Sequence, residues 1–393
     1  MFVRLALFFG LLCLCPVSTH AAEPEPIKIG EMMPYTNGTQ FAVPFREGYL
    51  LAVEEINKSG GIQGRPLQVI SRDDQADPSV AVRVAEELVS RDQVIMLIGA
   101  GFDHVGLAAA NFANRNQIPF LKQWAGNCPA VTNPQNRYWF STTPCYTAYA
   151  SLFAREAAKL PYTRWATIGP NYEFGHVMTT EFKKALKALR PDVIFVAEQY
   201  PAVGKINAAA EIQALDHAQP QAIFSTIFGP DLGSYLLYAR KIDFLKNIFT
   251  ISGTNIGSGV SIRALGEAYP KGWLTEGLPL DLTGHPAKVF ADAFQQKYGH
   301  FPDLMAVYGY NLMEVTAEAL RQAKSLKGED IREALQAVKI NGPFGPVVMK
   351  NKQLYLGDWI GYTDNQNGHG SFVGAHWYPA EVLFPDMLDK AGP

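Results

Sequence analysis

The stretch that decides the fold is residues 27–64, IKIGEMMPYTNGTQFAVPFREGYLLAVEEINKSGGIQG. Its apolar start, Ile27–Met33, predicts a buried strand, and the following segment, Pro34–Pro44, carries glycine and proline and predicts a loop. Apolar side chains then recur at helical spacing over Tyr49–Ile56, and a double glycine ends this helix because glycine readily adopts left-handed conformations. The loop of this β-loop-α unit follows a strand, and open parallel sheets bind ligands at the carboxyl ends of their strands.

The same alternation of strands and helices continues along the chain. Helices of ten or more residues between strands indicate parallel sheets covered on both faces, so the expected fold class is α/β with doubly wound sheets. The pattern restarts after Cys145, which indicates a second α/β array, and it ends in a mixed tail with the turn Asn365–Gly368. The further strands expected are Leu67–Arg72, Val94–Gly99, Pro119–Leu121, Trp165–Ile168, Val193–Ala197, Ala222–Thr226, Ile248–Ile251, Trp273–Gly277, Val347–Met349 and Trp359–Thr363.

Composition narrows the class of protein. The 393 residues are enough for two domains, and the 48% of hydrophobic residues against 18% charged residues indicate a globular chain with sizeable cores. A formal net charge of −3 without a basic patch argues against nucleic acid as a partner.

The first residues have the layout of a secretory signal peptide. Arg4 provides the charged start, Leu5–Leu14 the apolar core, and small residues up to Ala22 the cleavage region. The apolar run is too short for a permanent membrane span. Cys13 and Cys15 both follow leucine, whereas lipoprotein cleavage sites usually place a small residue there. We therefore expect an exported periplasmic protein, cleaved after Ala22 and without a membrane anchor.

Cleavage at that site leaves two cysteines, Cys128 and Cys145. In an oxidising compartment they are favoured to form a disulfide worth about 3 kcal/mol, and two buried thiols are the alternative. A metal site would need further Cys or His ligands at suitable spacing, and none accompany this pair.

Sequence motifs of enzymes are missing from the chain. Gly99-Ala100-Gly101 follows a strand, but the next glycine is Gly106, so the dinucleotide-binding spacing fails. The chain has no nucleophile elbow, Walker loop or zinc-protease motif. The adjacent carboxylates Asp73 and Asp74 are more typical of a solvated strand end than of an acid–base pair. We expect neither catalysis nor a cofactor.

Aromatic and small polar residues gather just after the expected strands, where they would converge on one cleft. Such a lining is typical of a small-molecule site, although some of these rings would pack beneath loops instead. His104, for example, is either a ligand-contacting residue or an exposed loop residue without a role in binding. The candidate ligand-binding residues are Tyr35, Phe41, Phe102, Asp103, His104, Trp124, Ala125, Gly126, Tyr172, Phe174, Phe228, Thr254 and Asn255.

At the level of motifs, the chain resembles the type I periplasmic solute-binding proteins of ABC importers, in the branched-chain amino-acid group. The matching segments are IKIG, EGYLLAVEEINKSGGIQG, RDDQADPSVA, VIMLIG, NYEFG and FGPVVM. The resemblance implies two Rossmann-like lobes that are joined by three crossings and close around a ligand. Lobe 1 would comprise residues 27–144 and 276–345, and lobe 2 would comprise residues 145–275 and 346–393.

The resemblance also implies pocket positions, and two of them depart from the amino-acid pattern. Asp103 stands about where a serine usually receives the α-carboxylate, and Thr254 or Asn255 stands where an acidic residue usually receives the ammonium group. A carboxylate facing a carboxylate is repelled, and a buried ammonium without a partner is costly. We therefore expect a planar, aromatic or amino-acid-like solute rather than leucine or valine.

The expected function is delivery of this solute by a monomer to an ABC permease. The alternatives are a ligand-sensing module of the same fold, a binding protein for branched-chain amino acids and, less favoured, an exported hydrolase.

Overall fold

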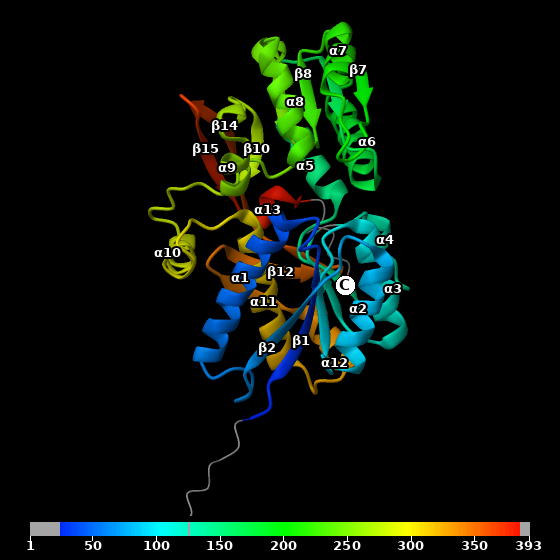
Figure 1. Ribbon diagram of the computed structural model, residues 1–393, viewed down its shortest axis with the longest axis vertical. Coiled ribbons are helices and arrows are strands. Elements are labelled where there is room, and N and C mark those ends of the chain that lie inside the picture. The colour runs from blue at the N-terminus through cyan, green and yellow to red at the C-terminus, as the bar shows by residue number, and fades with distance from the viewer. Residues whose placement is uncertain (1–23, 125, 386–393) are drawn as a thin grey trace, which may run out of the picture.

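The structure, a computed structural model, describes residues 24–124 and 126–385. The predicted signal peptide, residues 1–22, and the predicted site residue Ala125 lie outside the described residues. Figure 1 shows two lobes, one above the other, each with its own sheet and flanking helices. Within the described ranges, no helix is both long and apolar enough to cross a membrane.

The first lobe is built on an eight-stranded sheet with the order β11-β12-β13-β5-β4-β3-β1-β2. The strands from β2 to β5 pair in parallel, and β11, β12 and β13 pair antiparallel with one another. The central strands β3, β4 and β5 are fully buried, which explains their apolar runs. The bounds are β1 (Ile27–Met33), β2 (Leu67–Asp73), β3 (Met96–Gly99), β4 (Phe120–Lys122), β5 (Trp139–Ser141), β11 (Lys339–Gly342), β12 (Gly345–Lys350) and β13 (Gln353–Tyr355).

The second lobe has a seven-stranded sheet with the order β15-β14-β10-β9-β8-β6-β7. Its parallel part confirms the predicted α/β class, while β14 and β15 add an antiparallel hairpin at one edge. The bounds are β6 (Arg164–Ile168), β7 (Ile194–Gln199), β8 (Ala222–Ser225), β9 (Phe249–Ser252), β10 (Leu274–Gly277), β14 (Asp358–Gln366) and β15 (His369–Tyr378).

The helices cover both sheets, and one of them begins earlier than expected. The loop predicted over Pro34–Pro44 is shorter than that, because α1 starts at Thr39 and contains Pro44. Pro44 is the sixth residue of α1, so it removes the helix hydrogen bond to the Gln40 carbonyl, and the extensive packing of α1 against α11 holds the helix despite this loss. The bounds are α1 (Thr39–Lys58), α2 (Pro78–Ser90), α3 (Asp103–Asn116), α4 (Cys128–Thr132), α5 (Tyr146–Ala158), α6 (Glu173–Leu189), α7 (Ala208–Ala218), α8 (Gly229–Lys241), α9 (Gly259–Leu265), α10 (Ala287–Tyr298), α11 (Leu304–Gln322), α12 (Gly328–Ala337) and α13 (Ala380–Leu383).

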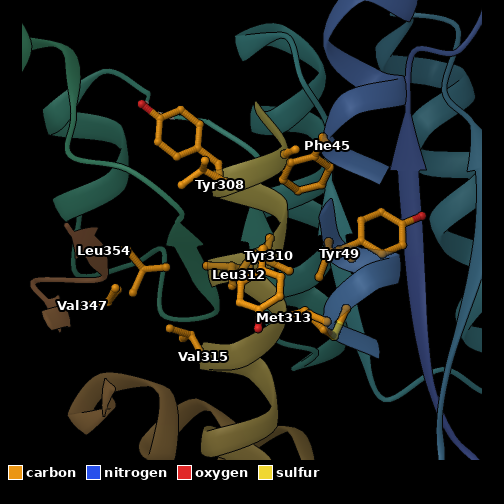
Figure 2. Packing of buried hydrophobic residues seen from close by; sticks show 14 of the residues in the cluster. Phe45, Tyr49, Tyr308, Tyr310, Leu312, Met313, Val315, Val347 and Leu354 are labelled. Carbon is orange, nitrogen blue, oxygen red and sulfur yellow. The ribbon is translucent and has the colours of Figure 1, made fainter. Parts of the chain in front are cut away.

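The core of the first lobe is centred on α11. Figure 2 shows α11 between α1, which carries Phe45 and Tyr49, and the strand segment that carries Leu354. Two glycines bring α1 and α11 together. A Cβ on Gly48 would lie 1.9 Å from the carbonyl oxygen of Ala306, and a Cβ on Gly309 would lie 2.1 Å from that of Phe45. The late helix α11 is thereby tied to the first β-loop-α unit of the chain.

The chain passes between the sheets three times, after β5, after β10 and between β13 and β14. Strand pairing bears on the lobe boundaries expected from the sequence. β12 and β13 belong to the first sheet, since Gln353 pairs with Ser141 of β5, although they follow the expected boundary at residue 345. We therefore propose that the third crossing lies at residues 356–357.

Candidate ligand-binding site

A cavity of about 390 Å³ lies between the lobes, where loops and helix starts follow the parallel strands. This volume is within the range of small-molecule sites. The first lobe contributes residues that follow β3 and β4 and residues at the starts of α1 and α11, and the second contributes residues that follow β6, β8 and β9. The lining residues are Gln40, Phe41, Gly101, Phe102, Asp103, Trp124, Tyr146, Tyr172, Phe174, Phe228, Gly229, Pro230, Leu232, Gly233, Thr254, Asn255, Ser258, Val260, Ser261, Ala264, Leu265, Asp303 and Met305.

Three aromatic rings form the first lobe's wall. Phe41 of α1 packs edge-on against Phe102, with ring centroids 5.8 Å apart, and against Trp124, with centroids 6.5 Å apart. Edge-to-face contacts of this kind are favourable and fix the orientation of each ring. This wall is therefore apolar and held in place before any ligand arrives.

Four further rings come from the second lobe. The centroids of Tyr146 and Phe174 lie 5.0 Å apart, those of Tyr172 and Phe174 5.9 Å, and those of Phe174 and Phe228 6.3 Å. Phe174 is thus the centre of this group. Since both lobes present rings to one cavity, a flat apolar molecule would contact aromatic surface on both sides.

A buried polar network also reaches the cavity. The Tyr146 hydroxyl donates to both carboxylate oxygens of Asp103, at 2.9 and 2.7 Å, and Lys122 Nζ lies 3.2 Å from Asp103 Oδ1. Lys122 is completely buried, and burial lowers its pKa while Asp103 acts in the opposite direction. Gly106 makes room for this lysine, because a Cβ there would lie 2.5 Å from Lys122 Cε.

Three helices begin at the cavity with an aromatic residue in the N-cap position. Phe102 precedes α3, Tyr172 precedes α6 and Phe228 precedes α8, and none of these side chains makes a capping hydrogen bond. Ser, Thr, Asp and Asn normally hold this position because they accept a hydrogen bond from the first turn. The positive ends of these helices therefore begin at the cavity without a side-chain cap, and a carboxylate in each first turn, from Asp103, Glu173 or Asp231, offsets part of their attraction for an anion.

A disulfide joins Cys128, at the start of α4, to Cys145, the N-cap of α5. The backbone N–H of Cys145 donates to Gln353 Oε1 at 2.6 Å, and that of Tyr146 donates to the Gly126 carbonyl at 3.2 Å. These bonds hold the first turn of α5 beside the cavity, and with it the Tyr146 ring.

The sequence also matches a family of known proteins. A sequence model of the family described as periplasmic binding protein matches residues 26–356. The chain belongs to this family. A curated relative from Pseudomonas aeruginosa, the leucine-, isoleucine-, valine-, threonine- and alanine-binding protein, is 25% identical over 345 residues, covering 87% of this chain and 90% of the relative.

Solved structures of substrate-binding proteins of transporters share the fold. One is the solute-binding protein of an ABC transporter from Rhodopseudomonas palustris BisB5, in complex with 3,4-dihydroxybenzoic acid. It has a TM-score of 0.79 at 21% identity and covers 91% of this chain and 98% of its own. Another is a branched-chain amino-acid transporter substrate-binding protein from Streptococcus pneumoniae, in complex with isoleucine. It has a TM-score of 0.78 at 19% identity and covers 90% of this chain and 99% of its own.

Within this periplasmic binding protein, most of the candidate residues line one cavity although they come from both lobes. The residues that it brings together are Phe41, Phe102, Asp103, Trp124, Tyr172, Phe174, Phe228, Thr254 and Asn255. The expectation of convergence at the carboxyl ends of the strands therefore describes the geometry well.

Three candidate residues lie outside the cavity lining, and we remove them from the proposed site. The Tyr35 hydroxyl donates to the buried Glu31 Oε1 at 2.7 Å, so Tyr35 is bonded to β1 instead. His104 is exposed, and its Nε2 lies 3.1 Å from the carbonyl of Ala76. Gly126 packs toward Trp139, whose ring would lie 3.3 Å from a Cβ at that position.

The sequence reasoning missed several polar residues of the cavity, among them Tyr146 and Asp303. Tyr146 is the first residue of α5, directly after Cys145. Asp303 is the N-cap of α11, and its carboxylate accepts from Met305 N at 2.9 Å and from Val260 N at 3.2 Å. Burial raises the pKa of Asp303. The available signal was an Asp just before a long apolar helix, a pattern typical of an N-cap.

Two carboxyl groups lie together at the crossings between the lobes. Glu276 of β10 and Asp358, the first residue of β14, are both 4% exposed, and the Tyr308 hydroxyl lies 3.4 Å from Asp358 Oδ2. Burial and the neighbouring Asp358 raise the pKa of Glu276 well above its ordinary value, and burial raises the pKa of Asp358 to about 7. Burial and the mutual repulsion of the two carboxylates therefore favour the uncharged form of Glu276.

No group of three or more His, Cys, Asp or Glu side chains suited to a metal ion occurs among residues 24–124 and 126–385.

Proposed function

We propose that this chain is an extracytoplasmic solute-binding protein that captures a small aromatic compound between its lobes and delivers it to an ABC importer. The observation that carries the proposal is the enclosure of one cavity by seven aromatic side chains from both lobes. Ligand contacts made by both lobes at once would favour the closed arrangement over an open one. The proposed role of the site is binding, without chemical conversion of the solute.

An aromatic acid fits the cavity best. The rings favour a flat body. The first turn of α3 carries Asp103, which repels a carboxylate, so the uncapped starts of α6 and α8 are the helix ends that would receive one. The Rhodopseudomonas palustris structure in complex with 3,4-dihydroxybenzoic acid supports this ligand class for the fold.

An amino acid is the second candidate, and Asp303 is the observation that favours it. Its buried carboxylate lines the cavity and offers a partner for an ammonium group. The Pseudomonas aeruginosa relative and the Streptococcus pneumoniae structure are named for amino-acid binding and transport. An aromatic amino acid would use both the rings and this carboxylate.

Several properties of the mature protein belong to the same proposal. We propose export with cleavage after Ala22, a periplasmic location, a monomeric state without a membrane anchor and partnership with a membrane permease. The family and the layout of residues 1–22 support export. Mass spectrometry of protein secreted by a bacterial host tests the cleavage site, and light scattering tests the monomer.

A ligand panel tests the main proposal. Thermal-shift and calorimetric titrations would compare benzoates, aromatic amides, aromatic amino acids and aliphatic amino acids. We expect binding by at least one aromatic compound, which chromatography would then recover unchanged. Micromolar binding of leucine or valine, with no binding of any aromatic compound, would contradict the proposal. Chemical conversion of a bound compound would contradict the proposed binding role.

A further inference from the structure

The Asp103–Lys122–Tyr146 network presents only hydrogen-bond acceptors to the cavity. Asp103 and Tyr146 line the cavity, whereas Lys122 is completely buried and is not part of the lining. Tyrosine has one hydroxyl hydrogen, and Tyr146 directs it at Asp103. An ionised carboxylate accepts about four hydrogen bonds, so Asp103 retains acceptor capacity beyond these two donors. A ligand group that meets this surface must therefore be a donor.

The charge balance of the network selects a neutral donor. Lys122 lies 3.2 Å from Asp103 Oδ1 and neutralises its charge, so a ligand cation gains little from this carboxylate. A ligand carboxylate would face acceptor oxygens and be repelled. The groups that remain are O–H and N–H donors without charge, and a phenolic hydroxyl combines such a donor with the flat ring that the aromatic walls favour.

We propose that this network is a hydroxyl-recognition site, which makes the protein select hydroxylated aromatic ligands over the same compounds without the hydroxyl. Asp103 is 8% exposed, so a bound ligand would seal it from water. A ligand without the hydroxyl would then leave a desolvated acceptor unpaired, and such sites discriminate strongly. This inference rests on the proposed function, because it assumes an aromatic solute in the cavity.

Matched ligands test the inference on the wild-type protein. Calorimetric Kd values would be compared for benzoate against 3- and 4-hydroxybenzoate, and for phenylalanine against tyrosine. We expect the hydroxylated member of at least one pair to bind about 10- to 100-fold more tightly. The methoxybenzoates keep the oxygen but lack its hydrogen, so they should bind no better than benzoate.

A double variant tests which residues are responsible. Asp103→Leu/Lys122→Met removes both charges together, and replacing a buried ion pair by apolar residues of similar size is often neutral for stability. We expect it to reduce the hydroxyl preference to within about twofold. The matched control is Asp364→Leu/Lys271→Met, which removes an ion pair with a 3.1 Å N–O distance outside the cavity and should leave the preference unchanged.

The outcomes separate the inference from the proposed function. Equal affinities within every pair, or methoxy compounds that match the hydroxyl compounds, overturn the hydroxyl site but leave an aromatic-binding protein. A folded double variant that keeps the full preference overturns the assignment to this network. If none of the aromatic compounds binds, both the inference and the proposed function fail. If the double variant does not fold, the ratios of the wild-type Kd values within the matched ligand pairs decide whether the hydroxyl site exists.

Discussion

Replacement of Glu276 by glutamine should make this protein progressively more stable than the wild type as the pH rises. Glu276 lies beside Asp358, buried at the crossings between the lobes. Burial together with Asp358 raises the pKa of Glu276 well above its ordinary value of 4.5. Glutamine has nearly the same size, and its amide can donate to Asp358 as a protonated carboxyl can. The substitution thus keeps the contact and removes only the titrating proton.

The size of the effect follows from proton linkage. Above pH 4.5 the unfolded wild-type chain loses the Glu276 proton while the folded protein keeps it, so the folded state binds one proton more. The free energy of unfolding therefore falls by about 1.4 kcal/mol for each pH unit. This loss continues up to the folded pKa of Glu276, and the glutamine variant does not incur it. Asp358 is present in both proteins, but its pKa depends on the residue at position 276, so the difference reports on this pair of carboxyls.

Urea unfolding followed by circular dichroism at several pH values measures this difference. We expect the gap between variant and wild type to widen steadily with pH, up to the folded pKa of Glu276. Glu381→Gln, at an exposed position of α13, is the control and should leave the pH dependence unchanged. Parallel stability curves for the Glu276 variant and the wild type would refute a protonated Glu276 in the folded protein.

Three further predictions concern the site and the packing. Trp124→Ala should weaken binding of the best aromatic ligand about tenfold or more at nearly unchanged melting temperature, because it removes one ring of the cavity wall; equal affinity in calorimetry would exclude Trp124 from the site. Denatured, unreduced mature protein should contain no free thiol, and reduction of Cys128–Cys145 should cost about 3 kcal/mol; two thiols in a colorimetric count would contradict the disulfide. Gly309→Ala should destabilise the protein by at least about 2 kcal/mol in urea, since its Cβ would lie 2.1 Å from a carbonyl oxygen of α1. Gly342→Ala, where the nearest atom is 3.4 Å away, is its control, and equal losses would argue against the steric cause.

Much of the fold could be predicted because its central strands are locally encoded. The apolar run at Ile27–Met33 coincides with β1, and its expected place in an α/β array is confirmed. The elements that were missed depend on distant partners. β5 has three residues and exists between β4 and β13, the latter more than 200 residues away in sequence. β15 carries several polar residues and glycines, and its antiparallel pairing with β14 makes it a strand.

The lining of the cavity could be predicted where residues follow strands, but not where the chain crosses between the lobes. Asp103 and Phe174 were found from their place after a strand, since parallel strands bring such positions to one edge. Asp303 reaches the cavity because α11 returns to the first lobe. There α11 packs closely on α1, since Gly48 and Gly309 have no side chains that would keep the two helices apart. Tyr35 has the right place in sequence, but the buried carboxyl of Glu31 holds its hydroxyl.

Helix capping carries a signal that connects sequence to function. Asp77 caps α2 and Asn207 caps α7, and neither residue lines the cavity, whereas Asp303, which caps α11, does. The N-caps of α3, α6 and α8 are Phe102, Tyr172 and Phe228, which give up a capping bond worth about 1 kcal/mol each. Side-chain caps are also missing from other described helices, such as α10 and α12, so what distinguishes α3, α6 and α8 is an aromatic N-cap residue at the cavity. An aromatic residue between a buried strand and a helix is therefore a sequence sign of the binding wall.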